Sequence, residues 1–244
     1  MTEHSIIWIA LGILVISFLY SSVGHAGASG YIAVMSLLGV AAAEIKPVAL
    51  VLNILVASVG TWQYWRAGHF RWQLFWPFAV LSIPLAFLGG YINLPVRIFK
   101  TLVGLVLLVS AVRFLSKPGE EPEPVPPSLP VAIGTGGALG FLAGLTGTGG
   151  GIFLTPAIII FRWAKVKTAS AVSALFILVN SVAGLLGNFG ATRKFPTFAW
   201  ALLVCALIGG ASGSYFGSHR FPQAVIKRLL AIVLIIAGFK LILT

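Results

Sequence analysis

The chain has 244 residues, of which 59% are hydrophobic and only 9% are charged, and its mean hydropathy is +1.04. This composition excludes an ordinary soluble domain and indicates an integral membrane protein. The net charge is +11, but the 16 Lys and Arg residues are scattered between hydrophobic runs, which is typical of loops that orient a membrane protein and not of a nucleic-acid-binding face.

Ten hydrophobic segments are predicted along the chain, five in each half, since a spanning helix needs roughly 20 apolar residues. The second segment of each half is short. At full helical rise residues 151–161 would cover only about half of the ~30 Å hydrocarbon core, so we expect a broken or re-entrant helix there. The ten segments are 5–23, 28–43, 47–64, 74–92, 96–115, 129–145, 151–161, 168–187, 197–217 and 224–243.

A polar stretch separates the two halves. Residues 116–130 carry six of the thirteen prolines and three of the five acids, a composition that cannot bury a core and favours an extended linker. We therefore divide the chain into a first transmembrane repeat at 1–115, a cytoplasmic linker rich in Pro and Glu at 116–128, and a second transmembrane repeat at 129–244.

A glycine-rich break follows the first segment of each half. The first break (residues 24–30) reads Gly-His-Ala-Gly-Ala-Ser-Gly, and the second break (residues 144–151) reads Gly-Leu-Thr-Gly-Thr-Gly-Gly-Gly. Closing segments also align, at an offset of 127 residues, and they place Pro95 on Pro222. The chain is therefore predicted to contain an internal repeat. At an offset of 120 residues the breaks pair Gly24 with Gly144, Gly27 with Gly147 and Gly30 with Gly150.

The distribution of cations predicts the orientation. An odd number of crossings in each half gathers ten of the sixteen cations on one side, whereas an even number divides them nine to seven. The odd number makes the repeats inverted, places both termini outside and leaves the linker in the cytoplasm. The odd number fits either five full crossings per half or three crossings and a re-entrant hairpin. The ten cations are Arg66, Arg71, Arg113, Lys117, Arg162, Lys165, Lys167, Arg220, Lys227 and Arg228.

The paired breaks predict a site for a small anion. Non-helical backbone at membrane depth is tolerated only where protein or a water-filled cavity satisfies its polar groups, so the site is expected where the repeats meet. An oxyanion that leaves water needs N–H and O–H donors. Backbone N–H groups of the breaks, helix N-termini and the hydroxyls of Ser29, Thr146 and Thr148 can supply them. Close helix packing is the alternative role of the glycines.

Three further polar side chains lie in or near apolar segments. His25 could hold an anion when protonated or relay a proton when neutral, and a local hydrogen bond is its simpler role. Asn53 and Asn180 could face the solute path, or bond neighbouring helices. The candidate substrate-binding residues are Gly24, His25, Gly27, Ser29, Gly30, Asn53, Thr146, Gly147, Thr148, Gly149, Gly150, Gly151 and Asn180, with Tyr31, Gln63 and Thr155 as weaker candidates.

The sequence carries no signature of an enzyme, so we expect no catalytic residue, no metal and no cofactor. Its four His residues are far apart, Cys205 is alone, and no HExxH, CxxC, GxSxG or Walker sequence is present. No cleavable signal peptide is evident. No acid lies deep in a hydrophobic segment, which disfavours a carboxylate relay for proton or sodium coupling. Coupling through His25, coupling through backbone carbonyls, and no coupling all remain open.

Residues 144–156, Gly-Leu-Thr-Gly-Thr-Gly-Gly-Gly-Ile-Phe-Leu-Thr-Pro, and residues 168–175, Thr-Ala-Ser-Ala-Val-Ser-Ala-Leu, resemble the TauE/SafE family of membrane permeases, also called sulfite exporters. The likeness covers nearly the whole chain, although the first break lacks the run of glycines and the proline that many members have. The resemblance implies a transporter of the bacterial or archaeal cytoplasmic membrane that moves sulfite, sulfonates or related anions, usually outward.

Together these features predict an all-α, polytopic membrane protein made of two inverted repeats with glycine-broken or re-entrant helices. We expect a secondary transporter that moves a small anion by alternating access, and the family resemblance alone implies that this anion contains sulfur. An anion channel is one rival, and a membrane-embedded enzyme or a non-transporting membrane subunit is another. The expected partners are the anion and membrane lipid but no nucleic acid, and a homodimer is left open.

Overall fold

A computed structural model of the chain describes residues 3–92, 108, 111–112, 123–192 and 199–243. Within these ranges the secondary structure is helical and contains no strand. The first half contains α1 (Glu3–Ser21), α2 (Ala28–Leu37), α3 (Ala42–Arg66) and α4 (Trp72–Tyr91). The second contains α6 (Leu129–Thr146), α7 (Gly151–Ile160), α8 (Val166–Thr192), α9 (Ala199–Tyr215), the π-helical turn η1 (Phe216–Arg220) and α10 (Gln223–Leu243).

The helices follow the hydrophobic segments closely. Each predicted segment except the fifth matches a helix, and the fifth, at 96–115, lies almost entirely outside the described residues. Four helices in the described part are long and apolar enough to cross a membrane: Glu44–Arg66, Trp72–Tyr91, Leu129–Thr146 and Val166–Asn188. By contrast, α2 and α7 have 10 residues each. At a rise of about 1.5 Å per residue each is roughly 15 Å long, half of the hydrocarbon thickness.

Helix pairs from opposite halves pack with their backbones almost in contact. On α6, a Cβ atom added at Gly140 would lie 2.3 Å from the carbonyl oxygen of Ser82 on α4. On α9, a Cβ atom added at Gly213 would lie 2.2 Å from the carbonyl oxygen of Phe18 on α1. Small residues permit such an approach, and membrane helices use it because lipid gives no hydrophobic force between them. The pairs α4–α6 and α1–α9 therefore join the two halves along their length.

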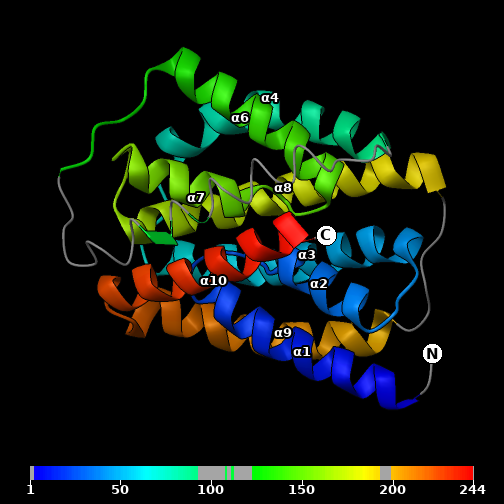
Figure 1. The fold of residues 1–244 in the computed structure, drawn as a ribbon. Coiled ribbons are helices and arrows are strands. Elements are labelled where there is room, and N and C mark those ends of the chain that lie inside the picture. The colour runs from blue at the N-terminus through cyan, green and yellow to red at the C-terminus, as the bar shows by residue number, and fades with distance from the viewer. Residues whose placement is uncertain (1–2, 93–107, 109–110, 113–122, 193–198, 244) are drawn as a thin grey trace.

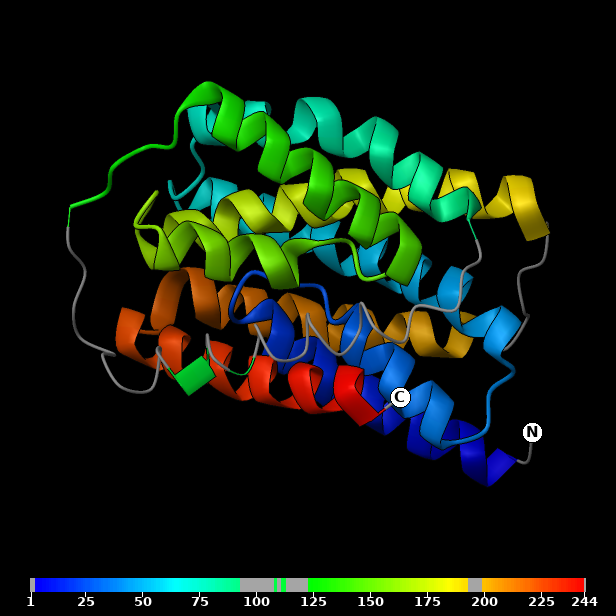
Figure 2. The same cartoon turned by 45° about the horizontal axis from the view of Figure 1, so that its top comes forward.

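The helices form a layered bundle (Figures 1 and 2). The α4–α6 pair lies along one side and the α1–α9 pair along the other, with α3 and α8 between them. The described part of the linker, residues 123–128, lies at one end of the bundle, and both chain termini lie toward the other end. The short helices α2 and α7 leave the middle of the molecule in opposite directions.

Candidate functional site

The first and second breaks meet inside the molecule through His25. Its Nε2 atom lies 2.9 Å from the carbonyl oxygen of Gly151 and 3.0 Å from Oγ1 of Thr155 on α7. With a proton on Nε2, the imidazole donates to the Gly151 carbonyl and leaves Nδ1 as an acceptor. Nδ1 is buried and has no hydrogen-bond partner among the described residues. The imidazole thus cross-links the breaks and keeps one free lone pair.

Asn53 of α3 makes a second bridge between the breaks. Its Oδ1 accepts a hydrogen bond of 3.0 Å from the backbone N–H of Ala28, the first residue of α2. Its Nδ2 donates to the carbonyl oxygen of Thr148 at 3.2 Å and to Oγ of Ser181 on α8 at 3.3 Å. The side chain is completely buried, so each of these bonds satisfies a group that water cannot reach. One amide therefore connects α2, the second break and α8.

Left-handed glycines begin both short helices. Gly27 caps α2 with φ of 103°, and Gly150 caps α7 with φ of 79°. A residue with a Cβ rarely adopts these angles, so glycine is required for the turn from the long helix into the short one. Because each turn ends at a helix N-terminus, both positive dipole ends lie at the breaks, where an anion is favoured.

The second break is packed against the side chains that hold it. A Cβ atom added at Gly149 would lie 2.7 Å from Oγ of Ser181 and 2.9 Å from Nδ2 of Asn53. One added at Gly151 would lie 2.3 Å from Cδ1 of Ile177 and 3.4 Å from Cδ2 of His25. Beside them, the hydroxyls of Thr146 and Thr148 are 2.8 Å apart. Only bare backbone fits between these hydrogen-bonding groups.

We call the place where the two breaks meet, at His25 and Asn53, the junction. Several candidate residues lie beside the junction and contact other groups. Gly24 packs against Ser170 of α8, where a Cβ atom would lie 2.4 Å from the carbonyl oxygen, and Gly30 packs against Ile16 of α1. Ser29 donates to the Tyr20 hydroxyl at 3.0 Å. Asn180 donates to the Phe176 carbonyl in its own helix at 2.8 Å, while its Oδ1 is buried without a hydrogen-bond partner among the described residues.

Two residues at the junction were not among the sequence candidates. Ser181 bonds Asn53, and its only sequence signal is that it follows Asn180 on a helix otherwise rich in small and apolar residues. The half-buried Lys46 runs its aliphatic chain past the second break, with Cγ 3.0 Å from where a Cβ of Gly147 would be, and its Nζ donates to the Gly90 carbonyl at 3.2 Å. Lys46 therefore brings a cation close to the break.

Gln63 and Tyr31 make structural contacts. Gln63 donates to the Ala211 carbonyl at 3.1 Å and accepts from Ser214 at 2.7 Å, so it bonds α3 to α9 away from the breaks. The Tyr31 hydroxyl donates to the Ala26 carbonyl, which closes the first break on itself.

Comparisons with known proteins agree with a membrane transporter. The family model described as Sulfite exporter TauE/SafE matches residues 9–241. A protein of Sinorhizobium fredii named "Probable membrane transporter protein y4hK" is 36% identical over 241 residues, covering 97% of this chain and 98% of the relative. The Bacillus subtilis "Probable membrane transporter protein YjnA" is 25% identical, and the match covers 94% of this chain and 96% of the length of that relative.

A second Bacillus subtilis protein, "Probable membrane transporter protein YunE", is 28% identical over 59% of this chain and 57% of its own length. No solved structure matches the chain significantly. With the family model matched along nearly the whole length and a 36% identical relative covered almost completely, the chain belongs to the TauE/SafE family of membrane transporters.

Proposed function

We propose that this protein is a secondary transporter that moves a small sulfur-containing anion, such as sulfite or an organosulfonate, by alternating access. The observation that carries the proposal is the junction of the two breaks, where His25, Asn53 and the glycine backbone of residues 147–151 come together in the middle of the bundle. The sulfur chemistry of the substrate is taken from the family description, and the junction supports a small anion of any similar kind.

The donors at the junction suit an oxyanion. Two helix N-termini, the Thr146 and Thr148 hydroxyls and the Asn53 amide carry N–H and O–H groups, and Lys46 adds a positive charge nearby. In this conformation several of these donors bond protein groups, which they exchange for the anion when the breaks separate. Glu44 is the acid in the first turn of α3. In the proposed mechanism these donors replace the hydration shell of the anion during its passage.

The proposed carrier is built from two inverted repeats, 1–115 and 129–244, joined by the cytoplasmic linker. Two features support this arrangement: α2 and α7 run in opposite directions from the middle, and α4–α6 and α1–α9 make the same kind of close backbone contact. In such a carrier the long helices rock against one another, and each short helix withdraws in turn to open the path on its own side. The packed junction then corresponds to a conformation closed on both sides.

Orientation in the cytoplasmic membrane follows from the cations at the linker end. Arg66 ends α3, Arg71 precedes α4, and Arg162 and Lys165 lie in the turn between α7 and α8, while Arg220 ends η1. By the positive-inside rule, these cations support a cytoplasmic position for this end and an external position for both termini.

Flux measurements on reconstituted protein test the proposal. Sulfite, sulfate, thiosulfate and small sulfonates are offered to proteoliposomes with and without a pH gradient, using liposomes without protein as the control. We expect saturable flux of at least one sulfur-containing anion, accelerated by the same anion on the opposite side. Flux that neither saturates nor shows counter-transport would favour the anion channel, and no flux of any anion would favour a non-transporting subunit.

A further inference from the structure

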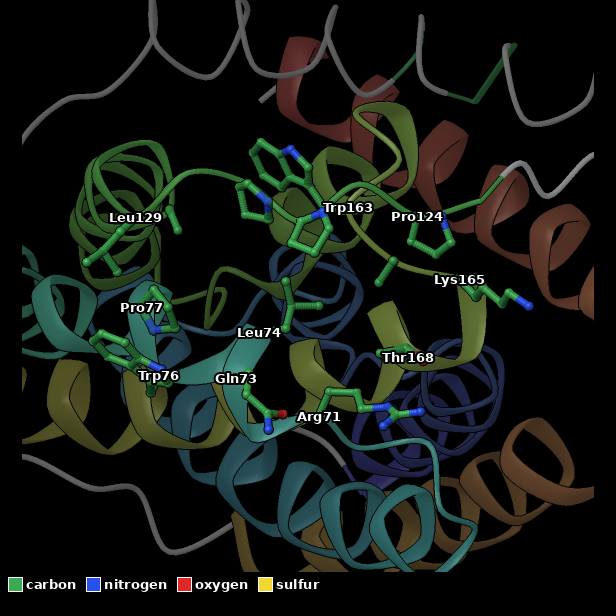
Figure 3. A pocket seen from close by; sticks show the side chains of 14 residues that line it. Arg71, Gln73, Leu74, Trp76, Pro77, Pro124, Leu129, Trp163, Lys165 and Thr168 are labelled. Atoms are coloured by element: carbon green, nitrogen blue, oxygen red, sulfur yellow. The ribbon is translucent and has the colours of Figure 1, made fainter.

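A pocket of about 550 Å³ lies at the linker end of the molecule, where its lining residues belong to neither break (Figure 3). Its walls are the start of α4, the start of α6, the linker prolines Pro124, Pro126 and Pro127, and the turn between α7 and α8. The linker is held in place because the N–H of Val125 donates to the Arg162 carbonyl at 2.8 Å. Pockets of roughly 300–1,000 Å³ hold molecules of drug size, so this one is far too large for sulfite alone.

The lining has a charged side and an apolar side. Figure 3 shows Arg71, Lys165 and Thr168 on one side of the view and Trp76, Pro77 and Leu129 on the other. None of the described residues that line the pocket is acidic. This division suits a molecule with an anionic group at one end and a hydrocarbon body at the other, because Arg and Lys bind phosphate strongly while the apolar wall excludes water.

The pocket lies at the level where lipid headgroups are expected. Trp62 and Trp65 near the end of α3 and Trp72 at the start of α4 are highly exposed, and Trp72 adjoins the pocket residues Gln73 and Leu74. Exposed tryptophans concentrate at the boundary between hydrocarbon and water. The cytoplasmic leaflet is rich in anionic lipid, and basic pockets between helices on that side bind lipid headgroups.

We propose that this pocket binds an anionic membrane phospholipid. Its phosphate lies between Arg71 and Lys165 with the Thr168 hydroxyl beside it, and the start of an acyl chain runs along Leu74, Trp76 and Leu129. The bound lipid fills the space under the linker and joins the α4–α6 pair to the turn between α7 and α8. The pocket prefers an anionic to a zwitterionic lipid because its two cations are not compensated by an acid among the described lining residues.

Native mass spectrometry of the purified, delipidated full chain tests this assignment. The protein is titrated with dioleoyl-phosphatidylglycerol and, separately, with dioleoyl-phosphatidylcholine. We expect the first phosphatidylglycerol to bind roughly tenfold more tightly than phosphatidylcholine. Arg71→Gln combined with Lys165→Gln should weaken the binding of phosphatidylglycerol by tenfold or more, because both cations near the headgroup are lost.

Two further variants separate the pocket from general attraction by charge. Arg66→Gln combined with Arg220→Gln removes the same charge from the same end, at residues that do not line the pocket, and should leave the first binding step within about threefold. Ala164→Trp keeps both cations but fills the pocket. It should weaken the binding of phosphatidylglycerol as much as Arg71→Gln combined with Lys165→Gln does. Equal losses in the two double variants, or full binding by Ala164→Trp, would overturn the assignment.

A competition arm identifies the source of the anionic group. Excess sulfite or 2-aminoethanesulfonate is added to the complex with phosphatidylglycerol. We expect no displacement, because these ions have no hydrocarbon body to occupy the apolar side. Displacement would overturn the lipid proposal and assign the pocket to the transported anion. Since binding is measured without flux, the outcome is independent of whether the protein proves to be a transporter.

Discussion

At the scale of single residues, Asn53 is bonded to both breaks. Its amide satisfies the N–H of Ala28 and the carbonyl of Thr148, and a buried polar group left unpaired costs about 1–3 kcal/mol. We expect Asn53→Leu to reduce flux at least tenfold and to lower the melting temperature in detergent. Flux in proteoliposomes and nanoscale scanning fluorimetry measure the two effects.

Gln63→Leu is the matched control for Asn53→Leu. It also removes an amide that bonds two helices, but a half-buried one at the α3–α9 contact and away from the breaks. We expect a similar loss of thermal stability with most of the flux retained. If both variants lose flux in proportion to stability, Asn53 has a structural role only.

His25 is expected to act as a hydrogen-bond donor. Because Nε2 faces the Gly151 carbonyl and the Thr155 hydroxyl, the amide nitrogen of glutamine can take its place. We predict that His25→Gln keeps flux within about threefold of wild type, while His25→Phe loses tenfold or more, since a lost bond to a buried carbonyl costs roughly 1–3 kcal/mol. Equal inactivity of both variants, with normal insertion, would show that transport needs the imidazole proton.

His69, in the turn between α3 and α4, gives the protein a pH-dependent stability. Partial burial lowers the pKa of His69 below its usual value of 6.5, and the nearby positive charges of Lys167 and His219 lower it further, against a hydrogen bond to Ser218 that raises it. The unfolded chain therefore binds a proton at a pH where the folded chain does not, and stability falls as pH drops through about 6.5.

The test compares melting temperatures at pH 7.5 and 5.5. We expect wild type to be less stable at the lower pH, and His69→Gln to reduce this difference. His4→Gln, which removes a histidine near the N-terminus, serves as the control. A pH difference that His69→Gln leaves unchanged would assign the effect to other groups.

At the scale of helices, the glycine turns decide whether α2 and α7 form where they do. Gly150 has φ of 79°, and a Cβ atom there would lie 2.9 Å from the ring of Phe176. A β-branched side chain is strained at this angle by about 1–3 kcal/mol. We expect Gly150→Val to insert in the membrane but to lose flux, measured by yield, gel-filtration profile and transport.

Gly134 of α6 supplies the control for that substitution. Among the described residues, no atom from outside its own stretch of helix lies within 4 Å of where its Cβ would be, so Gly134→Val should insert and transport like wild type. Wild-type flux in Gly150→Val would contradict the proposed site.

Helix positions could be predicted well from the sequence, whereas the register of the glycines could not. Length and hydrophobicity determine the spanning helices, so most ends of the described helices match within two residues. The largest miss is the segment 28–43, which ends six residues beyond α2. Gly30 and Gly150, which the sequence alignment pairs, have different structural roles. Gly30 lies inside α2 and packs on Ile16, whereas Gly150 forms the left-handed cap of α7. Glycine serves close packing in one place and an unusual backbone angle in the other, and sequence does not distinguish them.

The polar contacts of the site could be predicted even less well than the roles of the glycines, because they depend on how the helices pack. Asn53 and Asn180 look alike in sequence and are separated by 127 residues, the offset of the closing segments, yet Asn53 joins the breaks while Asn180 bonds its own helix. The contribution of Ser181 depends on the rotation of α8 against α3, and that of Lys46 on the approach of α3 to the second break. No local sequence pattern predicts the contact of Ser181 or that of Lys46.

At the scale of the whole molecule, the position of the linker makes the orientation testable. The described linker residues and the termini lie toward opposite ends of the bundle. Reporter tags fused at residue 120 should read as cytoplasmic, and tags at either terminus as external, in cells and in spheroplasts treated with protease. A C-terminal tag protected from external protease would show an even number of crossings in each half.

The shared amide of Asn53 has a consequence for energy conservation in the cell. Its carbonyl accepts from the start of α2 and its nitrogen donates to the second break, so neither α2 nor the second break can move away without breaking a hydrogen bond to the side chain that also holds the other. Simultaneous withdrawal of both would break the bonds from Asn53 to Ala28 and to Thr148, in buried surroundings that offer no water in exchange. In the proposed carrier, a state open through both breaks at once is thereby penalised, which preserves the ion gradients of the membrane.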